Sequence, residues 1–399
     1  MKKNIIQPAI LNFITPLFLF LLLTGCKKTE TANPSTSNSA GLMHAERGKD
    51  IKETGNFQQV NLVANNNEYN AQHIDPNLLN AWGLVFTPTG IAWVSAQAGH
   101  VSTIYDKEGN TIRPPVNIPS PMGPTGGNPT GVIFNGTSDF ILSNGSPARF
   151  IFDGVDGILS GWNPATGNSA VVIKNNSSTA AYTGLTMAIN NGANYLYAAN
   201  FKSGNIDVFD KNFNPVMMSF KDWFLPRGFA PFNIQNLQNL LYVTYAKVSP
   251  QGDDQAGPGN GFVDIFRPNG TFIKRLASRG ALNSPWGITL APKSFIKGSH
   301  QDMDDDDNDR EDRDDMASSA RMVVLVGNLG DGKINIYSMK GRFMGQLGEN
   351  KKPIVIEGLW ALVFPPATAT SIDPNRLYFT AGPSEEQDGL FGYLINTQR

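Results

Sequence analysis

The chain has 399 residues, of which 40 are glycine, 26 are proline and 17% are charged. The formal net charge of −2 provides no basic surplus, so nucleic acid is not expected as a partner. The abundance of turn-forming residues favours an all-β protein over a helical one, and the single cysteine excludes an internal disulfide.

Residues 1–25 have the parts of an export signal. Lys2 and Lys3 precede an apolar run at residues 10–23, and Leu-Thr-Gly-Cys follows at residues 23–26. This ending resembles the bacterial lipobox, in which the cysteine is lipidated and becomes the mature N-terminus. The run is short for a membrane span, although a membrane anchor or a plain cleaved signal is the alternative. We therefore expect acyl chains on Cys26 to attach the protein to a membrane.

The resemblance of residues 23–26 to a lipobox also predicts where the protein is located in the cell. A lipidated protein of this kind belongs to the cell envelope, and the Lys27-Lys28 pair lacks an aspartate retention signal. By analogy, this favours the outer membrane of a Gram-negative bacterium. Residues 26–55 are rich in Ser, Asn, Thr, Lys and Glu and contain almost no large apolar residues. Such a segment cannot bury enough surface to order itself, so we expect a disordered tether.

From residue 80 onward, a unit of three apolar strands recurs about every 50 residues, within the range of propeller blades. The expected first strands cover residues 81–86, 129–134, 182–187, 231–235, 285–290 and 359–364. The expected second strands cover residues 91–95, 140–143, 195–199, 241–245, 322–326 and 377–380. The expected third strands cover residues 101–106, 150–153, 206–210, 263–266, 334–337 and 390–394.

This repetition predicts a six-bladed β-propeller over residues 56–399. One small sheet cannot bury both of its faces, but sheets packed face to face around an axis can. Glycine after the opening residue, as at Gly83 and Gly287, would let the innermost strands crowd together. The aromatic openers are expected to fill the gaps between neighbouring blades. A pair of β-sandwiches is the alternative.

The ring needs a closing strand, because the last unit ends at about residue 396 with no room for an outer strand. Residues 58–64 alternate like a strand upstream of the first unit. We predict that this N-terminal strand is the outer strand of the last blade, which removes an open sheet edge.

Two features resemble known propellers. The openers, the Thr-Pro-Thr-Gly turn at residues 87–90 and the aromatic-Asp ends of the third strands resemble NHL-type six-bladed propellers. Residues 73–84, His-Ile-Asp-Pro-Asn-Leu-Leu-Asn-Ala-Trp-Gly-Leu, are similar to an uncharacterised family of exported bacterial propeller proteins. The resemblance covers residues 57–396. It implies the fold but no reaction, so it assigns no catalytic residue.

Ligands of propellers usually bind the face formed by loops that enter the first strands or join second to third strands. The ligand-binding residues expected there are His73, Asp75, Gln97, Asn144, Arg149, Asn200, Lys202 and Asn328. Asn144, Asn200 and Asn328 each follow an expected second strand, so three amides could ring the channel mouth and bind a cation or a polar ligand. The alternative is that they cap the strand ends by bonding to local backbone.

An acidic insert at about residues 298–318 interrupts the fifth unit. Asp302, Asp304 and Asp306 are candidate Ca²⁺ ligands there. The run lacks the glycine and glutamate of an EF-hand, and a solvated acidic loop is the alternative. No other cofactor can be identified from the sequence.

These features favour a lipid-anchored propeller that binds an unknown protein or small molecule. The alternative is a metal-dependent hydrolase or lyase resembling propeller lactonases. Such enzymes carry a metal-binding glutamate on a first strand, and the nearest residue of this kind here is Glu357, just before the sixth first strand. Trp82, Trp286 and Trp360 are expected to be packing residues rather than a sugar-stacking platform. The fold does not decide whether the protein is an enzyme.

Overall fold

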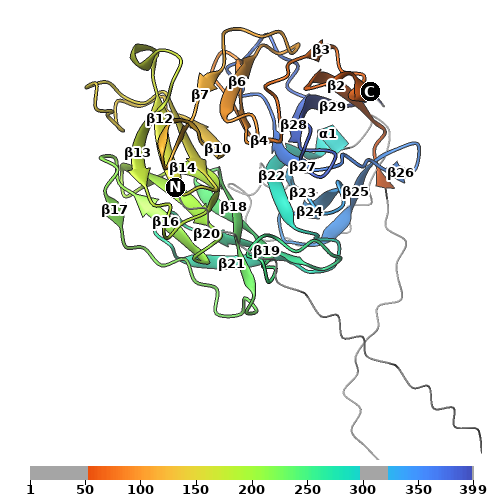
Figure 1. Ribbon diagram of the computed structural model, residues 1–399. Helices are drawn as coiled ribbons and strands as arrows, with labels where there is room; N and C mark the ends of the chain where they lie inside the picture. Colours follow the sequence, from red (N-terminus) through yellow and green to blue (C-terminus); the bar gives the residue numbers. More distant parts are fainter. Residues whose placement is uncertain (1–52, 297–321, 398–399) are drawn as a thin grey trace, which may run out of the picture. The chain divides into compact units, whose positions relative to one another are not determined.

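The computed structural model describes residues 53–296 and 322–397, which form six antiparallel sheets in a ring (Figure 1). The innermost strands are β4 (Ala81–Phe86), β10 (Pro129–Phe134), β14 (Tyr182–Asn190), β18 (Phe229–Leu237), β22 (Pro285–Pro292) and β27 (Leu359–Val363). Each contacts the next, and β27 contacts β4. The predicted six-bladed propeller is therefore confirmed.

Blades 1 to 3 continue outward from these strands. Blade 1 adds β5 (Ala92–Ala96), β6 (Val101–Tyr105) and β7 (Val116–Asn117); blade 2 adds β11 (Phe150–Gly154), β12 (Ile158–Trp162) and β13 (Val171–Asn175); blade 3 adds β15 (Ala193–Asn200), β16 (Asn205–Phe209) and β17 (Pro215–Val216). A small hairpin of β8 (Pro119–Ser120) and β9 (Gly123–Gly126) lies between blades 1 and 2 in the sequence.

Blades 4 to 6 follow the same plan with additions at the rim. Blade 4 adds β19 (Leu240–Lys247), β20 (Gly261–Phe266) and β21 (Phe272–Ser278); blade 5 adds β23 (Met322–Asn328), β24 (Ile334–Ser338), β25 (Phe343–Glu349) and β26 (Lys352–Pro353); blade 6 adds β28 (Leu377–Ala381) and β29 (Leu390–Asn396). The described helices are η1 (Asn67–Tyr69), η2 (Pro164–Thr166) and α1 (Lys293–Ile296), and none of them could cross a membrane.

The N-terminal strand closes blade 6, as predicted. β2 (Phe57–Ala64) pairs antiparallel with β29, from Phe57 opposite Asn396 to Ala64 opposite Leu390. Leu62, Val63 and Ala64 are fully buried, so the strand also completes the core, and β3 (His73–Ile74) pairs with its outer edge. β1 (Glu53–Thr54), within the segment expected to be a tether, pairs in parallel with β25.

The compact unit Asp50–Arg399 therefore contains both partners of every strand pair in the ring. It also contains all of the hydrophobic clusters that the blades bury. We therefore expect this unit to fold without the residues that precede it.

The strands predicted for blade 2 were partly wrong. Residues 140–143 are not its second strand, and residues 150–153, expected as the third, belong to the second strand β11. Phe140 has a positive φ of 63° and is fully buried against Phe213 of blade 3, with ring centroids 5.4 Å apart. This apolar run therefore packs between blades through its side chains instead of pairing with β10.

Every innermost strand has a β-bulge near its start. The registers with the second strands shift between Ala81 and Leu84 in blade 1, and at the corresponding place in the other five blades. A bulge inserts an extra residue and re-aims the side chains beside it. The repeated opener of the sequence is therefore the site of this bulge in each blade.

The glycines after the openers are required by close approach, as predicted. A Cβ at Gly83 would clash with the Thr130 carbonyl oxygen of blade 2, and one at Gly287 would clash with the Trp360 carbonyl oxygen of blade 6. Blade 4 has Asn233 instead, whose Nδ2 donates to the Trp286 carbonyl oxygen of blade 5 at 2.9 Å. The neighbouring innermost strands thus meet backbone to backbone.

The tryptophans are packing residues, but the expectation that they fill gaps between blades was wrong. Trp82 stacks on Trp360 with centroids 3.6 Å apart, and Trp286 meets both edge-on at 6.2 and 5.7 Å. Phe232 of blade 4 lies 5.9 Å from Trp360. The bulges of blades 1, 4, 5 and 6 therefore direct these rings to one cluster around the axis, where at most 6% of each tryptophan is exposed.

Candidate functional site

The loops that enter the first strands and those that join second to third strands share one face of the ring, here called the entry face. A hydrogen-bond network lies on it, next to the aromatic cluster. Asn80 Nδ2 donates to Gln97 Oε1 at 3.0 Å and to Glu386 Oε2 at 2.7 Å. Gln97 Nε2 donates to Asn128 Oδ1 at 3.2 Å. We call Asn80, Gln97, Asn128 and Glu386 the mouth network.

Asn80 joins this network to the axis. Its Oδ1 accepts a hydrogen bond from Trp360 Nε1 at 2.9 Å, so both ends of the amide are used. Asn80 is buried and has a positive φ of 44°, a conformation that asparagine tolerates better than most residues. The left-handed backbone before β4 therefore turns this side chain inward, and the amide links blade 1 to blade 6.

The loop that carries Glu386 is conformationally unusual. Ser384, Glu385 and Glu386 have positive φ values of 57°, 54° and 65° in succession. Hydrogen bonds hold the turn: Glu386 N donates to the Gly382 carbonyl oxygen at 3.2 Å, and Ser384 N donates to Glu357 Oε1 at 3.0 Å. Three consecutive left-handed non-glycine residues persist only where their surroundings fix them.

Carboxylates face the mouth from two blades. Burial raises the pKa of Glu386, and the negative charges of Asp254 and Asp253 in the β19–β20 loop raise it further, while the hydrogen bond from Asn80 opposes the rise. Burial also raises the pKa of Asp254, against the effect of the neighbouring Ser284 hydroxyl. Burial and the repulsion of neighbouring negative charges favour a proton on these carboxyls or a cation near them.

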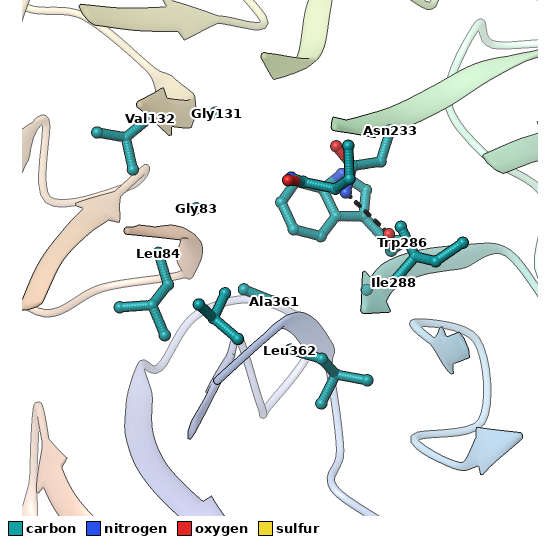
Figure 2. A pocket seen from close by; sticks show the side chains of 12 residues that line it. Gly83, Leu84, Gly131, Val132, Asn233, Trp286, Ile288, Ala361 and Leu362 are labelled. Carbon is teal, nitrogen blue, oxygen red and sulfur yellow. Dashed lines mark hydrogen bonds between the residues drawn. The ribbon is translucent and has the colours of Figure 1, made fainter. Parts of the chain in front are cut away.

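The axis itself has little room. A cavity of about 10 Å³ adjoins Trp286 and is lined by first-strand residues, enough for about one water molecule. Figure 2 shows Gly83, Gly131, Asn233 and Ala361 around it, with the hydrogen bond between Asn233 and Trp286 dashed. This cavity therefore admits no ligand larger than water.

Of the eight predicted ligand-binding residues, Gln97 belongs to the mouth network. His73 lies in β3 at the outer edge of blade 6. Asp75 Oδ2 accepts from the Tyr105 hydroxyl at 2.7 Å, and its Oδ1 accepts from Asn77 N at 3.0 Å. The structure thus places His73 and Asp75 at the rim, apart from Gln97.

Asn200 and Asn328 end their second strands, as predicted, and both are buried. Asn200 Oδ1 accepts from Ala181 N and Ser203 N, both at 3.2 Å. Asn328 Nδ2 donates to the Ala281 carbonyl oxygen at 2.8 Å. Each amide thus ties the end of its second strand to the loop that enters the first strand of the same blade, and each also donates to a nearby carboxylate, Asp207 or Asp331. Lys202 is exposed, and its Nζ donates to the Ser178 carbonyl oxygen at 3.0 Å.

The placement of Asn144 after a second strand was wrong, for the reason given for blade 2. Asn144 and Arg149 lie between β10 and β11, a first-to-second loop, and therefore on the face opposite the mouth. Asn144 Nδ2 donates to Asn163 Oδ1 at 3.0 Å. The three amides consequently do not form one ring. The proposed Ca²⁺ ligands Asp302, Asp304 and Asp306, like Cys26, lie outside the described residues.

Asn80, Asn128 and Glu386 are not among the residues predicted from the sequence. Asn80 and Asn128 each stand directly before a first strand or its opening proline. That shared position was the available signal. What the sequence did not reveal is that Asn80 and Glu386, 306 positions apart, are bonded to each other.

Comparison with known proteins finds relatives along nearly the whole chain. Uncharacterized protein L690 of Acanthamoeba polyphaga mimivirus is 30% identical over 390 residues, covering 94% of this chain and 95% of its own length. Uncharacterized protein R648 of the same virus is 29% identical, with 94% and 89% covered. No family model matches. These relatives are viral, so they do not support the expected bacterial family.

Among solved structures, a streptogramin B lyase is similar at a TM-score of 0.47 with 10% identity, covering 86% of this chain and 97% of that one. A protein of unknown function from Bacteroides thetaiotaomicron is similar at 0.46 with 9% identity, covering 79% and 70%. Nothing about function follows from likenesses of this size.

Proposed function

We propose that this chain, which belongs to the family of the mimivirus uncharacterized protein L690, is a ligand-binding propeller, a function inferred from the site itself. Its ligand is a small cationic molecule, such as an amine, that docks at the mouth network. The observation that carries this proposal is the bonding of Asn80 to both Glu386 and Trp360, which holds a half-buried carboxylate beside the tryptophan cluster of the axis.

The chemistry of the mouth favours a cation. Glu386 is partly buried, and Asp254 and Asp253 are near enough to raise its pKa. A bound ammonium group would relieve this repulsion, since an opposite charge within hydrogen-bond reach stabilises a carboxylate. Gln97 and Asn128 add amide oxygens and amide donors beside it, which suits a ligand that carries hydroxyl or amide groups as well.

The test is calorimetric titration of the protein with a diamine probe, putrescine. Binding to the wild type is expected, with Kd raised about tenfold or more by Glu386→Gln, the cost of losing one charge-assisted hydrogen bond. Glu385→Gln is the matched control, because Glu385 precedes Glu386 in the same turn and is exposed. Equal affinity of the Glu386→Gln variant and the wild type would refute the mouth as the cation site.

The proposal also includes a subcellular location. Cys26, in a chain exported by a bacterial host, is lipidated and anchors the propeller in the cell envelope, at the outer membrane. Its support is the sequence of residues 10–26. Metabolic labelling with an alkyne fatty acid should label the wild type and not the Cys26→Ala variant, and labelled protein should fractionate with membranes.

A metal-dependent hydrolase or lyase is the second candidate. It is favoured by one observation: the raised pKa values of Glu386 and Asp254 are of the kind that general acids and bases have. Titration with Mg²⁺, Ca²⁺ and Zn²⁺ would separate the candidates. Tight stoichiometric binding of one of these ions, abolished by Glu386→Gln, supports the enzyme; metal-independent binding of the diamine supports the binding module.

A further inference from the structure

The segment between β17 and β18, residues 217–228, carries three large apolar side chains in water. Met217 is 100% exposed, and Trp223 and Phe224 are each 84% exposed. Isolated exposed apolar residues are ordinary, but adjacent aromatics at this exposure mark an interaction surface more often. We call Met217, Trp223 and Phe224 the aromatic tip.

The aromatic tip stands on a fixed base. Asp222, directly before Trp223, has a side chain only 2% exposed and pairs with Arg275 Nη2 of β21. The same guanidinium bonds to buried Asp264 of β20, with Nε 2.7 Å from Oδ1. Phe224 N also donates to Asp222 Oδ1 at 2.8 Å. The ion pair therefore holds the backbone of the tip against blade 4.

Apolar contacts on the inner side of the same segment strengthen this base. The Phe220 ring lies 5.8 Å from Tyr197 of blade 3 and 5.5 Å from Phe266 of blade 4, and Leu225 packs against the same cluster. The chain thus partly buries Phe220 and Leu225 and leaves Trp223 and Phe224, which lie between them, exposed. Beside them is a hollow of about 300 Å³, lined also by Lys221, Gly270 and Phe272.

The charges of the segment identify the kind of partner. Its one acid, Asp222, is buried against Arg275, whereas Lys221 and Arg227 are exposed. Lys221 Nζ lies 5.4 Å from the Trp223 ring centroid. Bulky aromatics beside lysine and arginine partition into the interface of a membrane, where the rings enter the headgroup boundary and the cations contact anionic lipid.

We propose that the aromatic tip docks the propeller on an anionic lipid bilayer, with Trp223 and Phe224 inserted at the headgroup level and Lys221 and Arg227 on lipid phosphates. Charge complementarity selects this occupant over an uncharged apolar partner. The contact is made by the propeller itself, so it does not depend on acylation of Cys26 or on a ligand at the mouth network.

The experiment uses the Asp50–Arg399 unit, which contains the whole ring and has no lipidation site. It is mixed with vesicles of phosphatidylcholine and phosphatidylglycerol, and the bound fraction is measured by flotation. Binding with a blue shift of tryptophan fluorescence is expected. The Trp223→Ser/Phe224→Ser variant should lose about tenfold or more of the partition coefficient, since two large apolar side chains no longer enter the interface.

Two variants complete the test. Met122→Ser/Ile112→Ser removes apolar side chains that are 97% and 49% exposed elsewhere and should leave binding unchanged. Lys221→Gln/Arg227→Gln should reduce binding to the anionic vesicles toward the level measured with pure phosphatidylcholine. Absence of vesicle binding by the wild type, or an equal loss in the Met122→Ser/Ile112→Ser control, overturns the proposal. So does a concentration-dependent dimer that the Trp223→Ser/Phe224→Ser variant abolishes, because the tip would then bind a second copy.

Discussion

Trp82 and Trp360 stack with ring centroids 3.6 Å apart, although they open the first and the last blades of the ring. Their contact joins the two ends of the repeat at the axis. Trp360 Nε1 also donates a hydrogen bond to Asn80, which lies directly before β4. Trp360 therefore belongs to the aromatic cluster at the axis and also contacts the mouth network.

Trp360 therefore tests the packing of the axis and its link to the mouth together. Trp360→Ala should lower the free energy of unfolding by about 3–5 kcal/mol, because it leaves a cavity among three aromatic rings, those of Trp82, Trp286 and Phe232, and an unpaired Asn80 oxygen. Urea denaturation measures this. Trp223→Ala is the control: its side chain is 84% exposed, and a comparable loss there would contradict the packing account.

Gly83 tests the close approach of neighbouring blades. A Cβ at Gly83 would clash with the backbone of Thr130, whereas one at Gly123 would meet nothing within contact distance. Gly83→Ala should therefore destabilise the protein by about 1–3 kcal/mol, and Gly123→Ala should change stability little. Thermal unfolding of both variants at one pH makes the comparison, and equal melting temperatures would count against backbone contact between blades 1 and 2.

Closure of the ring depends on β2. Deleting Phe57–Ala64 exposes the edge of β29 and removes the buried Leu62 and Val63, so a loss of cooperative unfolding is expected. Deleting residues 29–49, which lie outside the compact propeller unit, should leave the melting temperature within about 1–2 °C of the wild type. If the two deletions melt alike, the N-terminal strand does not close the sheet.

Asp153 predicts a pH dependence. Burial raises its pKa to about 7, although Thr130 Oγ1 and Gly131 N donate to its Oδ1. Its folded pKa exceeds the ordinary value of 3.8, so the folded state binds the proton more tightly. The stabilisation is complete below the ordinary pKa and is lost as pH rises through 7.

Asp153→Asn isolates this effect. Asparagine keeps an oxygen for the two donors and cannot ionise, so the variant should lack the fall in unfolding free energy between about pH 4 and 7 that the wild type shows. Urea unfolding across that range checks it. An identical pH profile in both proteins would assign the fall to other groups.

Arg275 tests the base of the aromatic tip. Arg275→Met leaves Asp264 and Asp222 buried without their cation, and a loss of about 3–5 kcal/mol in unfolding free energy is expected. Proteolysis should then cleave within residues 217–228 sooner than in the wild type. Arg267→Met is the control, because Arg267 is exposed in the turn between β20 and β21 of blade 4. Equal protease sensitivity of the two variants would mean that the ion pair does not hold the segment.

The sequence determined the number of blades, the position of most strands and the closing strand. These follow from alternation of apolar residues and from turn residues, which act within a few positions of each other and recur with each blade. The glycines at the openers were also interpretable, because only a missing Cβ permits backbone-to-backbone contact.

Tertiary structure decided what depends on partners distant in the sequence. Residues 140–143 and 150–154 both contain several apolar residues. Only the structure shows that Phe140 packs on Phe213 of the next blade and that β11 is the strand that pairs with β10. The bulges turned the tryptophans to the axis. Asn80 and Glu386 meet at the mouth because ring closure brings blades 1 and 6 together, and no local pattern encodes that contact.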